Sequence, residues 1–218
     1  MITPGDMIAR IEAGFRKTAF RTGRSAPSAA VIGAMRRVAR TAFVRRSDRD
    51  AAHEDLALPI GHGQTISQPY IVALMVELLD LAPTSRVLEV GTGSGYAAAV
   101  LAEIAEAVFT IESVEPLARR AATRLARLGY RNVQVRHGDG TLGWPGAAPF
   151  DGIVVSAAAR QIPDALVEQL AAPGVLIAPV GAPDTEQDLI RLTKDDTGHV
   201  TRESILPVVF VPLLTNGV

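Results

Sequence analysis

The residues best suited to chemistry lie in a glycine-rich turn that follows a short apolar run. The segment reads Val87-Leu-Glu-Val-Gly-Thr-Gly-Ser-Gly-Tyr96, with glycines at positions 91, 93 and 95. Glycine adopts positive φ angles and lets a ligand approach the backbone closely. The spacing departs from the dinucleotide-binding fingerprint, because Tyr96 stands at the sixth position, where glycine or alanine is usual. The turn therefore predicts a small-molecule site and leaves its ligand open.

Three acidic residues fall at or near the ends of successive apolar runs around this turn. Glu89 lies inside the first run, Glu112 ends the second, and Asp139 stands between two glycines. A carboxylate among apolar residues is costly unless it is paired, so we expect Glu89 to have a partner. Glu112 stands where a carboxylate can accept ribose hydroxyls, and Asp139 or a neighbouring backbone group can face an adenine. Three acids favour S-adenosylmethionine, which is cationic at sulfur, over a pyrophosphate cofactor.

Each acid also has a purely structural interpretation. Glu112 could be a solvated strand end, and Asp139 could be a turn former between glycines. A surface position for Glu89 does not fit its apolar neighbours. Because all three acids fall at consecutive strand ends, a shared ligand site explains the set better than three separate structural roles.

The elements that must position these residues alternate in type from residue 86 onward. Alternating strands and helices form a parallel sheet covered on both faces, so the pattern predicts an α/β, Rossmann-like, doubly wound and mostly parallel sheet. The last two strands have no helix between them, which predicts an antiparallel C-terminal edge. The expected strands are residues 86–90, 107–112, 133–136, 150–156, 174–180, 188–193 and 204–211, and the expected helices are 96–105, 115–128 and 163–170.

The first 80 residues predict a helical extension. Apolar residues recur at helical spacing through Met7, Ile8, Ile11 and Phe15, and a second helix is expected over residues 28–40. Residues 51–70 look like a loop, and residues 71–79 like a third helix that leads into Pro83.

The composition excludes several chemistries. The chain has no cysteine, which removes thiolate metal ligands and the nucleophile that methylation of cytosine C5 requires. The four histidines, at positions 53, 62, 137 and 199, show no metal-ligand spacing, so we expect no metal site. Ser156-Ala-Ala-Ala-Arg160 stands where methyltransferases of amino groups carry an Asn/Asp-Pro-Pro-aromatic run. A carboxylate, which needs no general base, remains the obvious acceptor.

The charge is distributed unevenly. Residues 1–50 hold eleven Lys and Arg against four Asp and Glu, and residues 51–218 hold eleven against nineteen. The basic stretch has no recognisable nucleic-acid-binding motif, so we expect its arginines to lie on solvated helix faces and against the acidic body. Attraction of anionic peptides is the alternative. Residues 56–76 are uncharged but contain Pro and Gly, which excludes an apolar spanning helix. We expect a cytoplasmic monomer without nucleic-acid or membrane partners.

Residues 54–70 read Glu-Asp-Leu-Ala-Leu-Pro-Ile-Gly-His-Gly-Gln-Thr-Ile-Ser-Gln-Pro-Tyr. This segment resembles the signature of the protein-L-isoaspartate (D-aspartate) O-methyltransferases. The resemblance extends to residues 87–102, 128–133, 138–140, 149–151, 163–166, 169–170, 179–181 and 210–213. It implies a class I methyltransferase fold, S-adenosyl-L-methionine as cofactor, and methylation of the free carboxylate of L-isoaspartyl and D-aspartyl residues in damaged proteins and peptides. The ester then cyclises to a succinimide, which partly hydrolyses to aspartate.

The resemblance also assigns domain organisation and site residues. It implies one methyltransferase domain over residues 1–218, with residues 1–80 as helices and active-site loop and 81–218 as the cofactor-binding core. Ser67 takes the place of the family's active-site serine, whose hydroxyl binds the acceptor carboxylate rather than acting as a nucleophile. The expected cofactor-binding residues are Gln64, Thr65, Ile66, Ser67, Glu89, Gly91, Gly93, Ser94, Gly95, Glu112, Asp139 and Gly140, with Leu214 and Thr215 near the cofactor.

Alternatives remain open for residues near the expected site. Ser67 could be a turn hydroxyl or a helix N-cap, and we expect His62 to be a solvated loop residue rather than a base. The chain departs from the family's pattern at Ala39, Thr41, His53 and Ser113, none of which coincides with the expected serine or cofactor positions.

Two other functions also remain open. One is a carboxyl O-methyltransferase of the same fold that acts on a different peptide or a small-molecule carboxylate. The other is a non-catalytic binding module. The intact Ser67 and the intact set of glycines and acids argue against the module.

Overall fold

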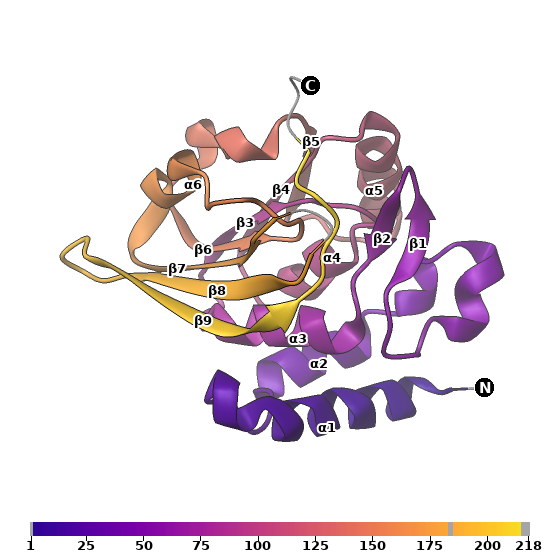
Figure 1. The fold of residues 1–218 in the computed structure, drawn as a ribbon. Helices are drawn as coiled ribbons and strands as arrows, with labels where there is room; N and C mark the ends of the chain where they lie inside the picture. The colour runs from indigo at the N-terminus through magenta and orange to yellow at the C-terminus, as the bar shows by residue number, and fades with distance from the viewer. Residues whose placement is uncertain (1, 183–184, 215–218) are drawn as a thin grey trace.

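The computed structural model describes residues 2–182 and 185–214 (Figure 1). The helices are α1 (Pro4–Thr22), α2 (Ala29–Arg37), α3 (Pro69–Leu78), α4 (Tyr96–Ala102), α5 (Glu115–Arg127) and α6 (Asp164–Glu168). The strands are β1 (Leu58–Gly61), β2 (Gln64–Ile66), β3 (Arg86–Val90), β4 (Ala107–Glu112), β5 (Val133–His137), β6 (Phe150–Val155), β7 (Leu170–Val180), β8 (Gln187–Lys194) and β9 (Val200–Val208). Four short 3₁₀ turns are η1 (Arg40–Ala42), η2 (Arg46–Ala51), η3 (Gly140–Leu142) and η4 (Pro145–Ala147).

Seven strands form one sheet in the order β5-β4-β3-β6-β7-β8-β9. The pairs from β5 to β7 are parallel, and β8 runs antiparallel to both β7 and β9. The expected α/β fold with an antiparallel C-terminal edge is therefore confirmed. The chain proceeds outward from β3 to β4 and β5 and then returns to β6 on the other side of β3. In open α/β sheets, ligands bind beyond the carboxyl ends of the strands at such a reversal of order.

The sheet separates two apolar cores, because successive residues of a strand point to opposite faces. On β3, Val87 belongs to the larger core, which also contains residues of α1 to α5. Leu88 and Val90 belong to the other core, which includes Leu166 of α6. The alternation therefore places Glu89 on the same face as Val87, within the core on the α3 and α4 side.

The N-terminal helices cover this face, with α1 outermost, packed on α2 and α3 and also against β9 at the edge of the sheet (Figure 1). A capping box starts α1: Thr3 accepts from the backbone N–H of Asp6, and the Asp6 carboxylate accepts from the backbone N–H of Thr3. The Phe15 ring meets the Tyr70 ring edge to face at a centroid distance of 5.7 Å. The Thr18 and Tyr70 hydroxyls are 2.5 Å apart. These contacts join α1 to the first turn of α3.

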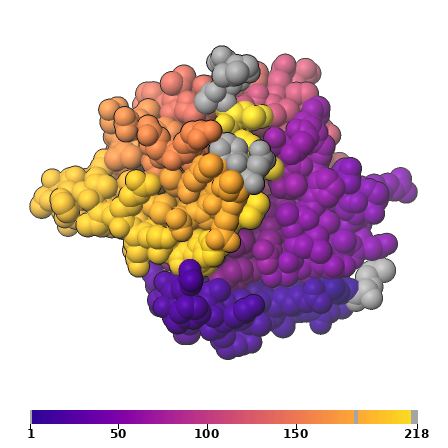
Figure 2. Space-filling view, in the orientation of Figure 1, coloured from indigo at the N-terminus to yellow at the C-terminus, as the bar shows by residue number. Residues whose placement is uncertain are grey.

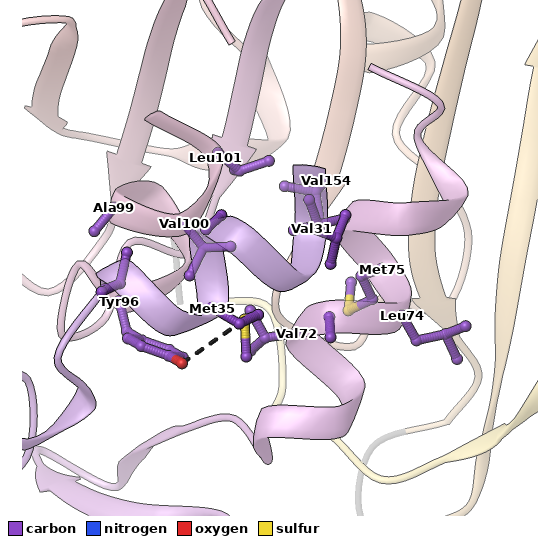
Figure 3. Close-up of a cluster of buried hydrophobic side chains, with 14 of the residues drawn as sticks. Val31, Met35, Val72, Leu74, Met75, Tyr96, Ala99, Val100, Leu101 and Val154 are labelled. Atoms are coloured by element: carbon purple, nitrogen blue, oxygen red, sulfur yellow. Dashed lines mark hydrogen bonds between the residues drawn. The ribbon is translucent and has the colours of Figure 1, made fainter. Parts of the chain in front are cut away.

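Buried side chains lock α2, α3 and α4 together (Figure 3). Met35 of α2 lies beside Val72 of α3, and the Tyr96 hydroxyl at the start of α4 donates to the Met35 sulfur at 3.8 Å. Burial raises the pKa of the Tyr96 hydroxyl above its usual range, so the phenol remains a neutral donor. The helix that follows the glycine turn is thus anchored to the N-terminal helices.

Replacing Gly14 with alanine tests how tightly α1 docks on α3. A Cβ atom there would lie 2.8 Å from Cε2 of Tyr70, closer than real Cβ contacts allow. An exposed helical Gly→Ala change stabilises by about 1 kcal/mol, whereas overpacking costs roughly 1–3 kcal/mol. We expect Gly14→Ala to lower the Tm by several degrees in a thermal melt. Gly5→Ala is the control, because its Cβ would meet only Thr3 Oγ at 3.6 Å. A raised Tm for Gly14→Ala would contradict the tight docking.

The structure corrects several expected boundaries. Residues 51–70 are not a simple loop, because β1 and β2 form an antiparallel hairpin there. The helix after the glycine turn ends at Ala102 rather than at residue 105, and Leu170 belongs to β7 instead of a helix. The last strand spans residues 200–208 rather than 204–211, because it pairs with the whole of β8. Short apolar runs at element ends carry too little periodicity to distinguish these alternatives.

The basic N-terminal stretch contacts the acidic body through a few ion pairs. Arg24 lies 2.5 Å from Asp80, and Arg37 pairs with Glu103. Arginines on α1 remain exposed. Because exposed ion pairs contribute little, these contacts are minor for stability. Among the helices in the described part of the chain, none is both long and apolar enough for a bilayer span.

Candidate active site

The largest cavity near the carboxyl ends of the strands has a volume of about 310 Å³. One wall comes from residues 57–71, which include the β1–β2 hairpin and the start of α3, and the other from residues 207–211 at the end of β9 and just after it. Figure 2 shows these two segments meeting on one face of the molecule. Buried Gln187 helps to hold the second wall, because its Oε1 accepts from the backbone N–H of Phe210 at 2.8 Å. Ser67 and Ser156 both line the cavity.

Two narrower clefts adjoin this cavity around the glycine turn. One contains Glu89 and Ser94, the other contains Glu112 and Gly140, and the two clefts share Thr65, Gly91, Gly93 and Ser156. Ser67 lines both the large cavity and the cleft of Glu89. The three spaces therefore meet at Thr65 of β2 and at Ser156, and the two clefts also share the glycine turn.

The glycine turn bends where side chains would obstruct it. Gly91 has a φ of +96°, and a Cβ there would lie 3.4 Å from the Cβ of Ser156. Gly95 has a φ of +87°, and its Cβ would lie 3.2 Å from Leu125 of α5. Both positions need the left-handed backbone that favours glycine. The turn can therefore pass close to Ser156 on one side and to α5 on the other.

Glu89 is fully buried, as expected from its apolar strand. Its register partner on β4 is Thr110, whose hydroxyl donates to Glu89 Oε2 at 2.6 Å. The Thr92 and Thr110 hydroxyls are 2.6 Å apart. Because Thr110 gives its proton to Glu89, Thr92 donates to Thr110. The expected partner of Glu89 is thus a neutral hydroxyl, part of a short chain of hydroxyls.

The other carboxylate oxygen, Glu89 Oε1, is buried and has no hydrogen bond among the described residues. Burial, with a smaller effect of the nearby Glu112 charge, raises the pKa of Glu89 to about 8, against the hydrogen bond from Thr110. Across residues 2–182 and 185–214, Glu89 has no cationic partner. A cationic ligand group in the adjoining cleft would supply one.

Glu112 ends β4 with both carboxylate oxygens already oriented. Its Oε2 accepts from the backbone N–H of Gly93 at 2.7 Å, and its Oε1 accepts from that of Val114 at 2.9 Å. Each oxygen of an ionised carboxylate has a further lone pair. Glu112 is therefore not a solvated strand end: it is 5% exposed and lines a cleft. Its free lone pairs can accept paired hydroxyls of a ligand.

Asp139 follows β5 and has a clear structural role. Its Oδ1 accepts from the backbone N–H and the hydroxyl of Thr141, at 2.8 and 2.6 Å, and so caps η3. Asp139 does not line the three spaces described above, whereas the neighbouring Gly140 does. A Cβ on Gly140 would collide with Val90 Cγ1, so glycine lets this backbone lie against the end of β3.

Ser67 lies between β2 and α3 and is half-buried. The N-cap of α3 is Gln68, so Ser67 is not the helix cap. Asp55 takes that part, since its carboxylate accepts from the Tyr70 backbone N–H at 2.9 Å and from Gln68 Nε2 at 2.8 Å. Over the described residues, the Ser67 hydroxyl makes no hydrogen bond within the protein. It is therefore available to a ligand in either adjoining space.

The structure brings most of the sequence-predicted site residues together. The residues that line at least one of the three spaces are Gln64, Thr65, Ile66, Ser67, Glu89, Gly91, Gly93, Ser94, Glu112, Gly140 and Leu214. Gly95 and Asp139 do not line them, and Thr215 lies outside the described residues. His62 is exposed, with a φ of 55°, as expected for a loop residue. No group of three or more His, Asp and Glu in residues 2–182 and 185–214 is arranged to hold a metal ion.

Sequence reasoning missed two residues at this site. Ser156 follows β6 directly, and its backbone N–H donates to the backbone oxygen of Val90 at 2.8 Å. It lines all three spaces. Its position directly after a strand adjacent to β3 could have identified it. Arg40 donates to the backbone oxygen of Ser67 at 3.0 Å. The only sequence signal for it was a single charge in an apolar segment.

The departures from the expected family pattern lie closer to the site than the sequence indicated. Ser113 follows Glu112 directly and lines the same cleft. Ala39 and Thr41 flank Arg40, which contacts the Ser67 backbone. His53 directly follows Ala52, another Arg40 partner, and its Nδ1 is 3.1 Å from the backbone oxygen of Ile2. None of the four departures coincides with Ser67 or an expected cofactor residue, but Ser113 borders the same cleft as Glu112.

Comparison with known sequences identifies relatives over nearly the whole chain. A family model described as protein-L-isoaspartate(D-aspartate) O-methyltransferase matches residues 18–217. Protein-L-isoaspartate O-methyltransferase 2 of Syntrophobacter fumaroxidans is 53% identical over 207 residues, which is 95% of this chain and 84% of the relative. Protein-L-isoaspartate O-methyltransferase 1 of Nitrosospira multiformis is 53% identical over 91% of this chain and 84% of its own length.

Solved structures share the fold. A protein-L-isoaspartate O-methyltransferase structure matches with a TM-score of 0.82 and 26% identity, over 95% of this chain and 66% of that one. A Plasmodium falciparum structure, described as a protein-L-isoaspartate O-methyltransferase in complex with S-adenosyl-L-homocysteine, matches with a TM-score of 0.74 and 26% identity over 94% of this chain and 98% of that one. The resemblance seen in the sequence is confirmed: the chain belongs to the protein-L-isoaspartate(D-aspartate) O-methyltransferase family.

Proposed function

We propose that this chain transfers the methyl group of S-adenosyl-L-methionine to the free carboxylate of L-isoaspartyl and D-aspartyl residues in proteins and peptides. Relatives named for this activity match over most of the chain. The observation in this structure that carries the proposal is the position of Ser67. It stands between a cleft with a buried acid and a cavity open to a peptide.

The residues around the glycine turn fit this cofactor. S-adenosyl-L-methionine supplies a methyl group on a positively charged sulfur, together with an ammonium group and two ribose hydroxyls. Glu89 Oε1 is a buried acceptor without a protein donor, so it suits the ammonium group. Glu112 has lone pairs left for the ribose hydroxyls. Gly91, Gly93 and Ser94 would border the cofactor, and Gly95 would shape the turn against α5.

The remaining expected cofactor residues lie at the rim of the same clefts. Gln64, Thr65 and Ile66 belong to β2, which forms one side of both clefts. Gly140 borders the Glu112 cleft, where an adenine would lie, and Asp139 would act there by holding η3 in place. We assign Asp139 this supporting role instead of direct contact.

The chain's contribution to methyl transfer is orientation. A carboxylate is already nucleophilic at neutral pH, so no residue has to remove a proton. The Ser67 hydroxyl would donate to one oxygen of the acceptor carboxylate and direct the other oxygen at the methyl group. Such alignment of reacting atoms supplies much of the rate in displacement reactions. With cofactor and peptide bound, the walls that include Thr65 of β2 and residues 207–211 would shield the point of transfer from water.

The acceptor cavity also predicts a charge preference. Among the described residues that line the cavity, Glu186 is the one that carries a charge, and it is exposed. We expect an isoaspartyl peptide with a neighbouring Lys to have a kcat/KM about two- to fivefold above that of its Glu twin, the effect of one exposed charge pair. Glu186→Lys should reverse the order, and the difference should shrink at high salt.

Initial rates on the two peptides measure this preference, with Glu203→Lys as the control. Glu203 lies on β9 and does not line the cavity. An unchanged order of the two peptides in Glu186→Lys would show that Glu186 does not face the substrate.

Mass spectrometry of the product tests the proposed function. A synthetic isoaspartyl peptide incubated with the protein and cofactor should first gain one methyl group. It should then lose methanol to give the succinimide and finally yield a mixture of aspartyl and isoaspartyl peptides. A panel of small dicarboxylates and normal peptides is included. Methylation of one of these, with the isoaspartyl peptide untouched, would favour a carboxyl methyltransferase with another substrate.

A further inference from the structure

Arg40 is the largest side chain that the structure buries completely. It begins η1, between α2 and the hairpin of β1 and β2. Its guanidinium lies over the ring of Tyr96, with Cζ 5.8 Å from the ring centroid. Within the described residues it forms no ion pair, since its hydrogen bonds go to backbone oxygens. A charge buried among neutral acceptors is an expensive way to stabilise a fold.

The hydrogen bonds of Arg40 link the residues before the β1–β2 hairpin to the backbone of Ser67. Its Nη1 donates to the Ala52 oxygen at 2.6 Å. Its Nη2 donates to the Leu56 oxygen at 2.9 Å and to the Ser67 oxygen at 3.0 Å. The planar guanidinium of Arg40 thus joins residues 52–56, before the β1–β2 hairpin, to Ser67, directly after it. Only a guanidinium offers donors in this fixed fork.

A second contact fixes the same segment from the other side. Asp55, from the chain before the hairpin, binds the Gln68 side chain and the Tyr70 backbone N–H, at 2.8 and 2.9 Å. Arg40 therefore ties the Ser67 backbone to residues 52–56. Asp55, within the same stretch, ties down the two neighbouring positions, Gln68 and Tyr70. The backbone of Ser67 is held, while its hydroxyl has no hydrogen bond to the part of the protein that the structure describes.

We propose that Arg40 is a positioning residue for methyl transfer, which fixes the Ser67 backbone so that the hydroxyl meets the acceptor carboxylate at the correct place. The proposal rests on the proposed function of Ser67. In this role, the position of Ser67 depends on the planar set of donors of the Arg40 guanidinium and not only on its positive charge. A misplacement of about 1 Å at a reacting centre can cost on the order of 100-fold in rate.

A double-mutant cycle of Arg40→Lys and Ser67→Ala tests this role. Lysine keeps the charge and the stem, but one amine cannot span the Ala52, Leu56 and Ser67 oxygens together. We expect Arg40→Lys to lower kcat about tenfold or more, with the KM for the cofactor changed less than about threefold. In the Ser67→Ala background the same change should lower kcat less than about twofold, because residues that act as a unit are not additive. Equal losses in both backgrounds would overturn the proposal.

The control is Arg191→Lys on β8, which contacts the end of α3 opposite to Ser67. Arg191 donates to the backbone oxygen of Leu78, at the C-terminal end of α3, at 3.1 Å, and lies outside the site. It should lose stability without loss of kcat. Arg40→Gln is prepared in parallel, so that one unstable variant does not end the test. Failure of both Arg40 variants to fold would assign Arg40 to the fold and contradict the proposal.

Hydrogen exchange keeps this test separate from the proposed function. In Arg40→Lys, amides of residues 64–70 should exchange faster than in the parent, while those of the central strands β3 and β4 are unchanged. An inactive parent protein with this exchange pattern would refute the proposed function but leave the positioning contact intact. An active parent with unchanged exchange at residues 64–70 would refute the positioning role alone.

Discussion

Ser67→Ala is expected to lower kcat for an isoaspartyl peptide about 100-fold, while the Kd for S-adenosyl-L-methionine changes less than about threefold. The loss corresponds to a misaligned acceptor rather than a missing base. The Ser67 hydroxyl borders both the acceptor cavity and the Glu89 cleft, and it has no hydrogen bond to described protein groups that the substitution would break. Rapid-quench kinetics give kcat, and calorimetry gives the Kd.

The control for Ser67→Ala is Ser204→Ala on β9, whose hydroxyl donates to Asp188 at 3.0 Å on the exposed surface. It should leave both quantities near the parent values. Equal losses of kcat and cofactor affinity in Ser67→Ala would instead make Ser67 a residue of the cofactor cleft and remove it from the chemistry.

Glu89→Gln is expected to weaken cofactor binding on the order of 100-fold, the loss of one strong hydrogen bond between opposite charges in a buried site. Glutamine has the same shape and can still accept from Thr110, so the hydroxyl chain is kept. What it lacks is the negative charge next to the proposed ammonium group. Calorimetric titration measures the change. An unchanged Kd would show that the orphaned oxygen of Glu89 faces no cation.

Cofactor affinity should depend on pH because the pKa of Glu89 is raised to about 8 by burial, with a smaller effect of the Glu112 charge. Below that pH the free protein holds the carboxyl protonated, and binding a cation must release this proton. Between about pH 5.5 and 7.5, cofactor affinity should therefore rise up to about tenfold per pH unit. Glu89→Gln should lack this part of the dependence. Equal slopes for the two proteins would contradict the assignment.

The raised pKa of Glu89 affects the stability of the ligand-free protein in the opposite direction: stability falls as pH rises. The folded, ligand-free protein retains a proton on Glu89 that the unfolded chain gives up near the ordinary value of 4.5. The stabilising contribution is complete below that value and is lost as pH rises through about 8. Denaturant melts at several pH values should show parent stability falling relative to Glu89→Gln over this range.

The positions of the acids could be predicted from the sequence because strand periodicity and strand ends are local properties. Val87, Leu88 and Val90 required Glu89 to be buried, and the structure places it there. The sequence also predicted a partner for it, but not which one. Thr110 could not be identified, because the register of β3 against β4 depends on packing across the sheet.

Arg40 shows what local patterns cannot provide. Its partners, the backbone oxygens of Ala52, Leu56 and Ser67, have no side-chain signature and lie up to 27 residues away. The β1 and β2 hairpin was missed for a related reason. It is short, and the glycines and prolines near it resemble those of a loop. The family resemblance predicted Ser67 as a site residue, whereas only the structure shows that Arg40 binds its backbone oxygen.

In the proposed function, the methyl acceptor is the isoaspartyl carboxylate. The most direct measurement incubates the protein with radiolabelled S-adenosyl-L-methionine and two peptides that differ only in whether one residue is isoaspartyl or aspartyl. We expect base-labile label in the isoaspartyl peptide alone. Label in both peptides at similar rates, or cofactor binding with no label in either, would contradict the claim.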